Sequence, residues 1–496
     1  MMKKVPQTIA TPVALSMLLS CVAGAAHAAT ITVAPGQSVQ AAVNAAKAGD
    51  VVLLQKGTHN QKVLIEGKSG AAGSFITLRG ETGAIIDGKN VVTTDREGLV
   101  TIRDSKYIRV ENLTVTGLAT NDPERMPVGI LVEGSGSNIQ IVGNEIHDIR
   151  HTATCAESDD CQMGAHGLAV YGTSAAGITD VRIERNKVYN NVLQASEALV
   201  LNGNVNRFEV LFNDVYDNNN IGYDFIGYEG ECGGCGDNDR VRNGIVRGNR
   251  AANNSTTTNP WYSFKGSAAG FYVDGGRYIV FERNIATRND LGFEFASEHP
   301  GKATEDILMT NNFVYLNRDG GLALGGYDAD RGAARRIRVN NNSFYKNKGF
   351  ASEITLQYKV IDSSFNNNAI YGASTIADSY IASPGGSSGN TWGRNLWWAP
   401  STSSSRGIPG TTLYQDPRYV APDTGNLRLQ ATSPAIGQGT LAAAVTGWSS
   451  PLWTTYYPSG SIPANGNRDY DGQQRVEGGS IDLGADEYGT TAGTAP

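Results

Sequence analysis

The sequence is poor in charge. Lysine, arginine, aspartate and glutamate make up 18% of the 496 residues, and the formal net charge is −7. A protein that binds nucleic acid through its phosphates needs a basic face, which this composition does not favour. Beyond the N-terminal leader there is also no apolar run long enough to cross a membrane. We therefore expect neither a nucleic-acid partner nor a membrane span.

The N-terminus carries a stretch that is typical of a secretion signal. Two lysines precede the apolar run 10–22, and an Ala-His-Ala triplet at 26–28 forms a small-residue cleavage site. Lipoprotein processing at Cys21 is the alternative. We expect residues 1–28 to be removed and the mature chain to be secreted or periplasmic.

Cysteine is scarce. After the leader, the chain has only Cys155, Cys161, Cys232 and Cys235. An even number in an exported chain predicts two disulfides, paired either within each loop or between the two loops. The rival interpretation is a zinc site, because the spacing of Cys232 and Cys235 suits that metal. The absence of a matching histidine pair favours the disulfides.

Long amphipathic helical patterns are missing as well, and a strand-bearing repeat takes their place. Asparagine-rich turns recur at intervals of roughly 26 to 42 residues, and most are followed by a glycine and alternating apolar residues. The turns are centred on Asn144, Asn186, Asn213, Asn249, Asn284, Asn312, Asn342 and Asn368. The glycine-led strands include those that start at Gly167, Gly222, Gly270, Gly292 and Gly321. Such a repeat predicts a stacked β-solenoid in which the turn asparagines satisfy the backbone.

The two ends of the repeat differ from its middle. Residues 37–46 have helical spacing and predict an amphipathic helix that caps the first coil. Beyond residue 373 the repeat decays into loops rich in serine, glycine and proline. We expect a β-helix over 29–372, terminal coils and a C-terminal cap over 373–488, and a flexible tail over 489–496.

This organisation resembles the right-handed parallel β-helix superfamily, the pectin-lyase-like fold, from about Thr30 to Tyr488. The resemblance is carried by AGDVVLLQKGTH near the start, by the asparagine turns and by RVEGGSIDLGADEYG near the end. It implies an all-β right-handed parallel β-helix. The resemblance does not indicate which function the protein has, because this superfamily includes polysaccharide lyases, glycoside hydrolases, epimerases, tailspikes and adhesins.

Alternation along each glycine-led strand identifies the side chains that face outward. Phe271, Val273, Phe293, Phe295, Leu322 and Leu324 must face the core. The outward column two residues after the glycine then reads Leu131, Ala169, Val200, Asp224, Tyr272, Glu294 and Ala323. The column four residues after it reads Glu133, Tyr171, Asn202, Ile226, Asp274, Ala296 and Gly325, with Gln357 next. Asp224, Asp274 and Glu294 therefore gather on consecutive coils.

The surroundings of these three acids suit a carbohydrate. Small residues in the same columns leave space, and insertions at 151–164, 230–240 and 253–268 can wall a groove. Sugar rings could stack on the aromatic side chains nearby. The candidate substrate-binding residues are Glu229, Glu298, His299, Trp261, Tyr262, Tyr272, Tyr327 and Asp328.

Glycoside hydrolysis is the favoured function. Asp274 and Glu294 would form the carboxylate pair, one as general acid and the other as nucleophile or base, with Asp224 tuning the pair. The matching stretch, GFYVDGG followed by GFEFASEH, is similar to β-helix glycoside hydrolases. No cofactor is needed in this interpretation. Strand spacings put the two backbones about 8 Å apart, which fits either a retaining or an inverting mechanism.

The alternative is a uronate lyase that eliminates across the sugar ring. A calcium ion held by Asp224, Asp274 and Glu294 would neutralise the uronate, and Lys265, Arg277 or Lys359 would abstract the proton. The chain lacks the paired Asp-Asp calcium motif of known lyase families. A third possibility is a non-catalytic glycan-binding surface protein. All three interpretations imply a polysaccharide or oligosaccharide partner, and we expect a monomer.

Overall fold

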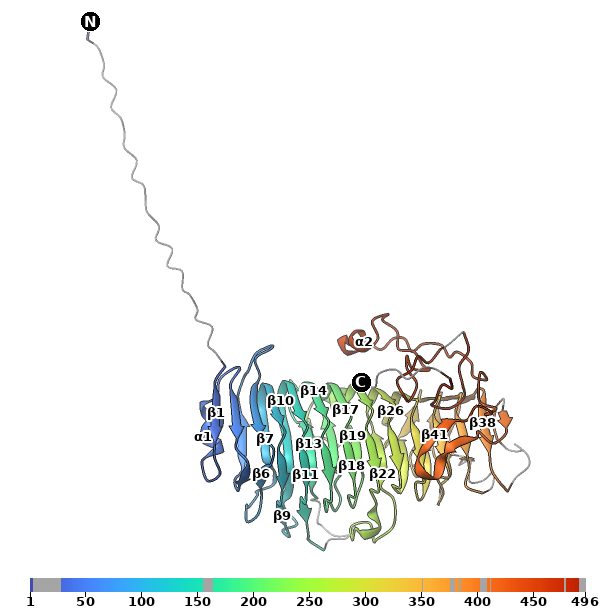
Figure 1. The fold of residues 1–496 in the computed structure, drawn as a ribbon, viewed down its shortest axis with the longest axis horizontal. Coiled ribbons are helices and arrows are strands. Elements are labelled where there is room, and N and C mark those ends of the chain that lie inside the picture. Colours follow the sequence, from blue (N-terminus) through green and yellow to red (C-terminus); the bar gives the residue numbers. More distant parts are fainter. Residues whose placement is uncertain are drawn as a thin grey trace.

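The computed structural model of this protein describes residues 1–2, 28–154, 164–349, 351–374, 380–382, 385–401, 408–410, 412–476 and 479–489. Its strands stack into an elongated cylinder with three parallel faces (Figure 1). The predicted all-β, right-handed parallel β-helix is confirmed. Within the described parts of the chain, no helix is long and apolar enough to cross a membrane.

The first sheet carries the glycine-led strands. It contains β4 (Val63–Glu66), the first part of β7 (Arg96–Glu111), the first part of β10 (Met126–Val142), β13 (His166–Gly172), β16 (Leu199–Gly203), β19 (Tyr223–Ile226), β22 (Ala269–Asp274), β25 (Leu291–Ala296), β28 (Gly320–Leu324), β32 (Ile354–Leu356) and β36 (Tyr380–Ala382).

The second sheet follows around a corner, and β7 and β10 run through that corner into it. It contains β1 (Thr30–Val33), β2 (Val51–Leu54), β5 (Ile76–Gly80), the second parts of β7 and β10, β14 (Ile178–Glu184), β17 (Val205–Leu211), β20 (Arg242–Arg247), β23 (Arg277–Glu282), β26 (Ala303–Thr310), β29 (Ala333–Arg335), β30 (Arg338–Asn340), β33 (Val360–Ile361), β34 (Ser364–Asn366) and β37 (Thr391–Trp392).

The third sheet closes the cylinder with short strands. It contains β3 (Gly57–His59), β6 (Ala84–Asp87), β8 (Thr114–Thr116), β11 (Glu145–His147), β15 (Lys187–Tyr189), β18 (Asp214–Tyr216), β21 (Arg250–Ala252), β24 (Ile285–Thr287), β27 (Phe313–Tyr315), β31 (Ser343–Tyr345), β35 (Ala369–Tyr371), β38 (Asn395–Trp398) and β39 (Thr412–Tyr414). The smaller elements are β9 (Ala119–Thr120), β12 (Arg150–His151), β40 (Tyr419–Ala421), β41 (Asn426–Leu429), α1 (Val39–Ala45), α2 (Pro451–Tyr456), η1 (Gly236–Asn238), η2 (Thr256–Thr258) and η4 (Pro422–Thr424).

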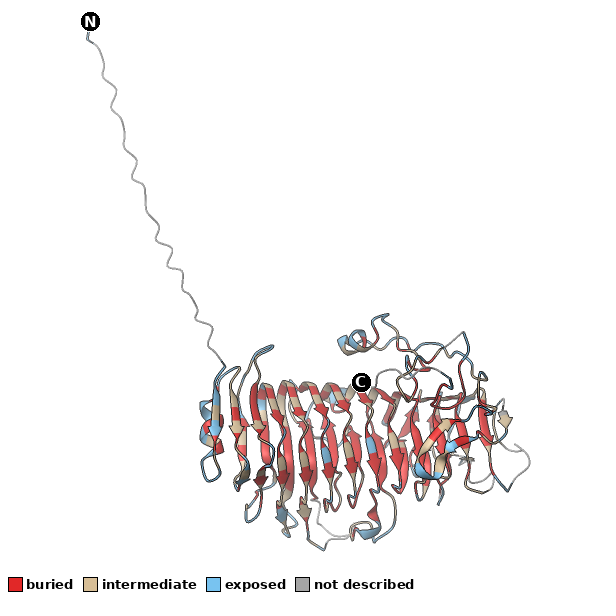
Figure 2. Ribbon diagram, in the orientation of Figure 1, coloured by how far each residue is buried: buried red, intermediate tan, exposed pale blue. Residues whose placement is uncertain are grey.

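The core runs the whole length of the cylinder. Buried residues follow the strands of successive coils (Figure 2). All six side chains predicted to face inward are fully buried, and Phe271 stacks between Tyr223 and Phe293 of adjacent coils, at 4.6 and 4.7 Å between ring centroids. Identical apolar positions on neighbouring coils therefore fill the interior layer by layer.

Both ends of the repeat contain the predicted elements, but the C-terminal segment takes an unexpected path. Helix α1 lies within the predicted range 37–46 and packs against β1, β2 and β4. Strands β36 to β39 continue the coils, and the chain then returns along the second sheet (Figure 1). There α2 brings Tyr457 to Glu282 of β23, with a hydrogen bond of 3.3 Å. Much of this segment therefore covers a flank of the cylinder rather than its end.

The turn asparagines form the predicted ladder between the second and third sheets. Asn284 is fully buried; its Nδ2 donates to Val246 O at 2.9 Å, and its Oδ1 accepts the backbone N–H of Asn249 at 2.9 Å. The same pattern extends to Asn395. A second ladder follows the third sheet, and the sequence analysis missed it. Its members are Asn191, Asn218, Asn254, Asn289, Asn317 and Asn347.

Replacing Asn284 by alanine should lower the free energy of unfolding by at least about 3 kcal/mol, because several buried donors and acceptors lose their partners. Urea denaturation followed by tryptophan fluorescence measures the loss. The control is Asn121→Ala, since Asn121 is exposed in a loop. Equal stability losses in the two variants would show that the ladder contributes nothing special.

Candidate active site

The structure has the strand register that the alternation predicts. Val200, Asp224, Tyr272 and Glu294 are Cα partners on β16, β19, β22 and β25. Asp274 pairs with Ile226 on one side and with Ala296 on the other. In this register the three acids stand together on the outer side of the first sheet. A register shifted by one residue would instead point their side chains into the core.

This outer side is covered rather than open. The exposed fraction is 2% for Asp224, 4% for Asp274 and 5% for Tyr272, whereas the sequence analysis predicted a surface groove. The loop 253–268 folds over the sheet and is held by Asp290. One carboxylate oxygen of Asp290 accepts the backbone N–H groups of Thr256, Ser267 and Ala268 at 2.9 to 3.0 Å. The acids therefore lie in a partly enclosed site.

A cavity of about 400 Å³ lies between this loop and the sheet. It is lined by Ile221, Trp261, Tyr262, Ser267, Tyr272, Leu291, Glu294, Glu298, Tyr327 and Gln357. Four of these side chains are aromatic and two are carboxylic acids. Its size is within the range of small-molecule sites. The lining therefore combines apolar rings, which suit the faces of a sugar, with acids that can exchange protons.

Two acids near the cavity hold their protons unusually tightly. Burial raises the pKa of Glu294 to about 8, and the negative charge of Glu298 adds to this shift. Burial also raises the pKa of Glu197 to about 8, and Glu229 and Glu298 add to that shift. At neutral pH the carboxyl group of Glu294 is therefore mostly protonated and able to donate.

The other acids of the cluster shift in the same direction. Burial raises the pKa of Asp224 well above its usual value, and repulsion from Glu197 and Asp274 adds to the effect. Burial and the charge of Glu298 likewise raise the pKa of Asp274. These shifts share a cause, since neighbouring carboxyl groups in a water-poor site cannot all ionise.

Hydrogen bonds fix the second acid of the cavity. The backbone N–H of Glu298 donates to Asp274 Oδ1 at 2.8 Å, and Tyr272 OH donates to Glu298 Oε1 at 3.2 Å. Asp274 does not line the cavity itself. The predicted pair Asp274 and Glu294 is thus brought close together, but Glu298 is the acid that shares the cavity with Glu294.

The predicted lyase bases lie outside this lining. Arg277 forms ion pairs with Glu305 at 3.4 Å and Asp306 at 3.2 Å. Lys359 Nζ donates to the backbone carbonyl oxygen of Arg331 at 2.7 Å, and Lys265 is exposed on the covering loop. Asp328 accepts backbone N–H groups and closes a turn. Among the described residues, no lysine or arginine lines the cavity.

Two titratable residues near this site, Glu197 and His166, were missed by the sequence analysis. Glu197 precedes Ala198, which stands where the other strands have glycine, so the column one residue before the glycine was never followed. His166 occupies that column on the adjacent coil, where its ring bonds to the carbonyl oxygen of Glu197 at 2.8 Å and to Tyr171 OH at 2.9 Å. Following this third column would have found both.

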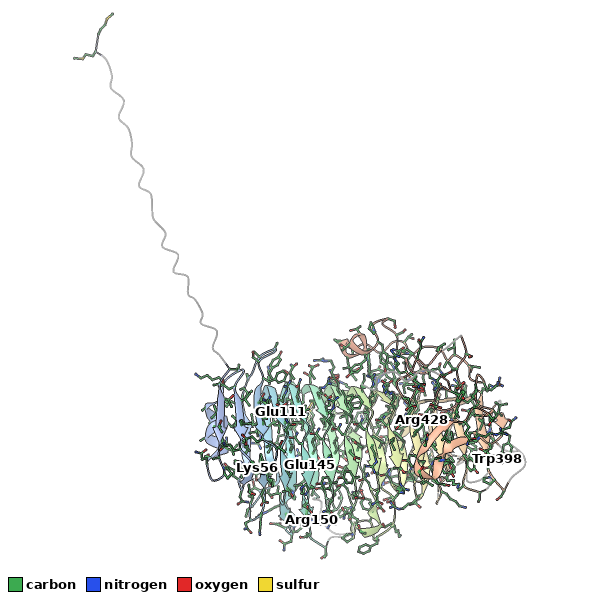
Figure 3. The ribbon with its side chains drawn as sticks, viewed as in Figure 1. Lys56, Glu111, Glu145, Arg150, Trp398 and Arg428 are labelled. Carbon is green, nitrogen blue, oxygen red and sulfur yellow. A yellow bond between two sulfur atoms is a disulfide. The ribbon has the colours of Figure 1, made fainter. Side chains whose placement is uncertain are left out.

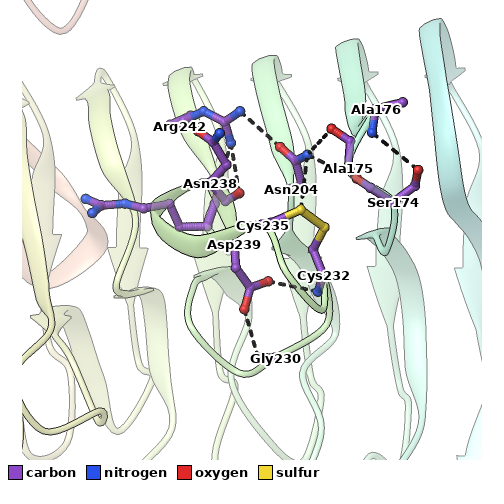
Figure 4. Close-up of a disulfide and its surroundings, with 11 residues drawn as sticks. Ser174, Ala175, Ala176, Asn204, Gly230, Cys232, Cys235, Asn238, Asp239 and Arg242 are labelled. Atoms are coloured by element: carbon purple, nitrogen blue, oxygen red, sulfur yellow. Dashed lines mark hydrogen bonds between the residues drawn. A yellow bond between two sulfur atoms is a disulfide. The ribbon is translucent and has the colours of Figure 1, made fainter.

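One of the predicted disulfides is present and local. Cys232 and Cys235 are bonded to each other in the loop after β19 (Figure 4). Asp239 supports this loop by accepting the N–H of Cys232 at 3.0 Å. Cys155, Cys161 and Cys21 lie outside the described residues. The bond in the loop excludes the zinc site considered for Cys232 and Cys235.

Comparison with known proteins gives one relative in sequence. No family model matches the chain. The uncharacterized protein YwoF of Bacillus subtilis (strain 168) is 38% identical over 342 residues, which are 68% of this chain and 70% of YwoF. At this identity and coverage, the two proteins share a family.

Solved structures of similar shape are distant. Pectate lyase Pel9A is 17% identical, with 94% of this chain and 97% of that chain covered and a TM-score of 0.49. The GH136 lacto-N-biosidase from Eubacterium ramulus is 12% identical, with 78% and 68% covered and a TM-score of 0.49. An alginate lyase from Paenibacillus sp. str. FPU-7 is 16% identical, with 78% and 98% covered and a TM-score of 0.43. At these identities and TM-scores, none assigns an activity to this chain.

Proposed function

The chain belongs to the same family as YwoF of Bacillus subtilis, and we propose that it is a carbohydrate-active enzyme, namely a glycoside hydrolase. The observation that carries this proposal is the cavity between loop 253–268 and the first sheet. Two carboxylic acids, Glu294 and Glu298, face it within a wall of aromatic side chains. Export through the N-terminal leader is part of the same proposal, since polysaccharide substrates lie outside the cell.

Glu294 is proposed as the general acid. Its carboxyl group lines the cavity, and its pKa of about 8 keeps it protonated at neutral pH. It would donate that proton to the glycosidic oxygen as the bond to the leaving group breaks. The raised pKa follows from burial, which is how a carboxylic acid can serve as an acid at neutral pH.

Glu298 is proposed as the second carboxylate, either as nucleophile or as the base that activates water. Tyr272 and Asp274 would act as positioning residues, because one holds its side chain and the other holds its backbone N–H. Trp261, Tyr262 and Tyr327 would hold the sugar rings. Asp224 and Glu197 belong to the same cluster of acids, and their raised pKa values favour the protonated, neutral form.

Hydrolysis is favoured over elimination by the charge of the cavity. A uronate brings its own carboxylate, which must be neutralised before its C5 proton can be removed. Glu294 and Glu298 line the cavity without a lysine or arginine among the described residues, and Arg277 and Lys359 are engaged elsewhere. A neutral sugar would meet no such repulsion.

The products distinguish the three candidate functions. We expect the protein to release reducing ends from a neutral polysaccharide or oligosaccharide, in a panel of plant, algal and bacterial glycans, without new ultraviolet absorbance. Each reaction is run with and without a chelator. An unsaturated, ultraviolet-absorbing uronate product that disappears on chelation would establish a lyase instead. Binding without any product across the panel would indicate a glycan-binding protein.

A further inference from the structure

Three side chains from successive coils converge beside the cavity. Glu229 follows β19, Asp274 ends β22 and His299 follows β25. One ligand atom from each of the three lies within 4.8 Å of the other two. Two carboxylates and an imidazole brought so close form a donor set that proteins use for divalent metal ions.

The histidine is oriented toward this cluster without a hydrogen bond. His299 Nε2 is buried from solvent and has no hydrogen-bond partner. It lies 4.0 Å from Asp274 Oδ2, which is too long for a hydrogen bond. Two atoms that bind the same metal ion do not hydrogen-bond to each other. The distance between His299 Nε2 and Asp274 Oδ2 would have to shorten only slightly for both atoms to bind one ion.

A buried amide adds a second, independent observation. Asn202 is 1% exposed, and its Nδ2 donates to Glu229 Oε2 at 2.7 Å. Its Oδ1 has no hydrogen-bond partner, which is costly for a buried oxygen. The side chain contacts the cluster, so an ion bound there would have an amide oxygen at hand. Such an oxygen is a common ligand for a hard or borderline cation.

The two carboxylates of the cluster are not paired with lysine or arginine side chains that the structure describes, although the charges of Arg331 and Lys302 act on His299. Among the described residues, neither Glu229 nor Asp274 forms an ion pair with a lysine or arginine, and His299 is the one basic group beside Asp274. Glu298 and Asp224 add further carboxyl groups close by. A divalent cation would neutralise this excess of acid.

The arrangement also has the outer support and access that a metal site needs. Asp274 Oδ1 is held by the backbone N–H of Glu298, which leaves Oδ2 turned toward His299. Such a fixed second oxygen orients a metal-binding carboxylate. Glu229 is exposed, so an ion can reach the cluster from solvent.

We propose that Glu229, Asp274 and His299 bind one divalent metal ion of the zinc class, with Asn202 beside it. The imidazole favours zinc over calcium, which prefers sites made of oxygen alone. This site goes beyond the proposed hydrolase function: it shares the positioning residue Asp274, but neither proposed catalytic acid, Glu294 nor Glu298, belongs to it. The ion would fix the segment that carries Glu298 and His299 at the edge of the cavity.

Metal binding is measured directly and without any glycan. Mature full-length protein with its disulfide intact is stripped with a chelator, dialysed and titrated calorimetrically with Zn²⁺ alone and with Ca²⁺ alone. We expect one equivalent of Zn²⁺ to bind, and we expect His299→Gln to weaken that binding at least about 10-fold. The matched control is His147→Gln on β11, a half-buried histidine beside Asp148.

The outcomes separate this site from the proposed activity. Glu294→Gln should leave Zn²⁺ binding unchanged, so a failed hydrolase proposal does not remove the metal site. If His299→Gln fails to fold by circular dichroism, Glu229→Gln and Asp274→Asn provide the same measurement. The proposal is overturned if the unmodified protein binds no Zn²⁺, if these variants bind it as well as the unmodified protein does, or if Ca²⁺ binds as tightly at the same residues.

Discussion

Replacement of Glu294 by glutamine is expected to lower kcat about 1000-fold on whichever glycan the protein hydrolyses, with a much smaller change in KM. General acid catalysis contributes about 10² to 10⁴ in rate, and glutamine cannot donate a proton to the leaving oxygen. The amide keeps the shape of the side chain, so the wall of the cavity should remain intact. Initial rates of reducing-end release measure the effect.

The choice of substrate sharpens this experiment. A glycoside with a good leaving group, such as a nitrophenolate, needs little protonation, and we expect it to recover most of the lost rate with Glu294→Gln. The control is Glu145→Gln, because Glu145 (labelled in Figure 3) lies on β11 of the third sheet. It pairs there with Lys187 at 2.7 Å. A Glu294→Gln enzyme with full activity on natural glycans would remove Glu294 from the mechanism.

The sequence contains enough information to place Asp224, Asp274 and Glu294 together. Large apolar residues on both sides of Tyr272 and Glu294 must face the core, and strand alternation then turns the acids outward. The asparagine turns align successive coils, so neighbours across coils follow from the repeat. The regular strands and turns of the repeat are therefore enough to predict that these three acids are neighbours.

The position of loop 253–268 over the site could not be predicted from strand alternation. Loop 253–268 has no repeating pattern, and its path depends on Asp290, which lies well beyond it in the chain. Glu298 lies past the end of β25, where alternation no longer fixes the direction of a side chain. The sequence analysis could name Glu298 as a candidate, but only the folded loop shows that it shares the cavity with Glu294.

The lack of a repeating pattern also explains why the path of the C-terminal segment was not predicted. Residues 373–488 lose the repeat, and the sequence analysis expected terminal coils and a cap there. The return of this segment along the second sheet depends on contacts with remote coils, such as Asn311 Nδ2 donating to Asn465 O at 2.9 Å. These partners share no sequence pattern with each other, so their pairing emerges only from the packed structure.

Stability is expected to fall as pH rises from about 5 to 8. Glu294 has a pKa of about 8 in the folded protein and an ordinary value near 4.5 in the unfolded chain. Between these values the folded state holds a proton that the unfolded state releases, so rising pH favours unfolding. One pKa unit corresponds to about 1.4 kcal/mol, and because solvent partly reaches Glu294 from the cavity we expect it to contribute about 3 kcal/mol.

The groups around Glu294 make this a test of the cluster as a whole. Glu298 raises its pKa directly, while Tyr272 and Asp274 face it from β22 and are shifted by its charge in turn. Urea denaturation at pH 5, 6.5 and 8, in the presence of a chelator, should show a steep loss of stability for the unmodified protein. Glu294→Gln should flatten that slope and leave the protein more stable at pH 8, because the buried acid no longer has to ionise. If Glu294→Gln leaves the pH dependence of the unfolding free energy unchanged, this carboxyl group has an ordinary pKa in the folded protein. Glu294 would then be ionised at neutral pH and could not serve as the proton donor.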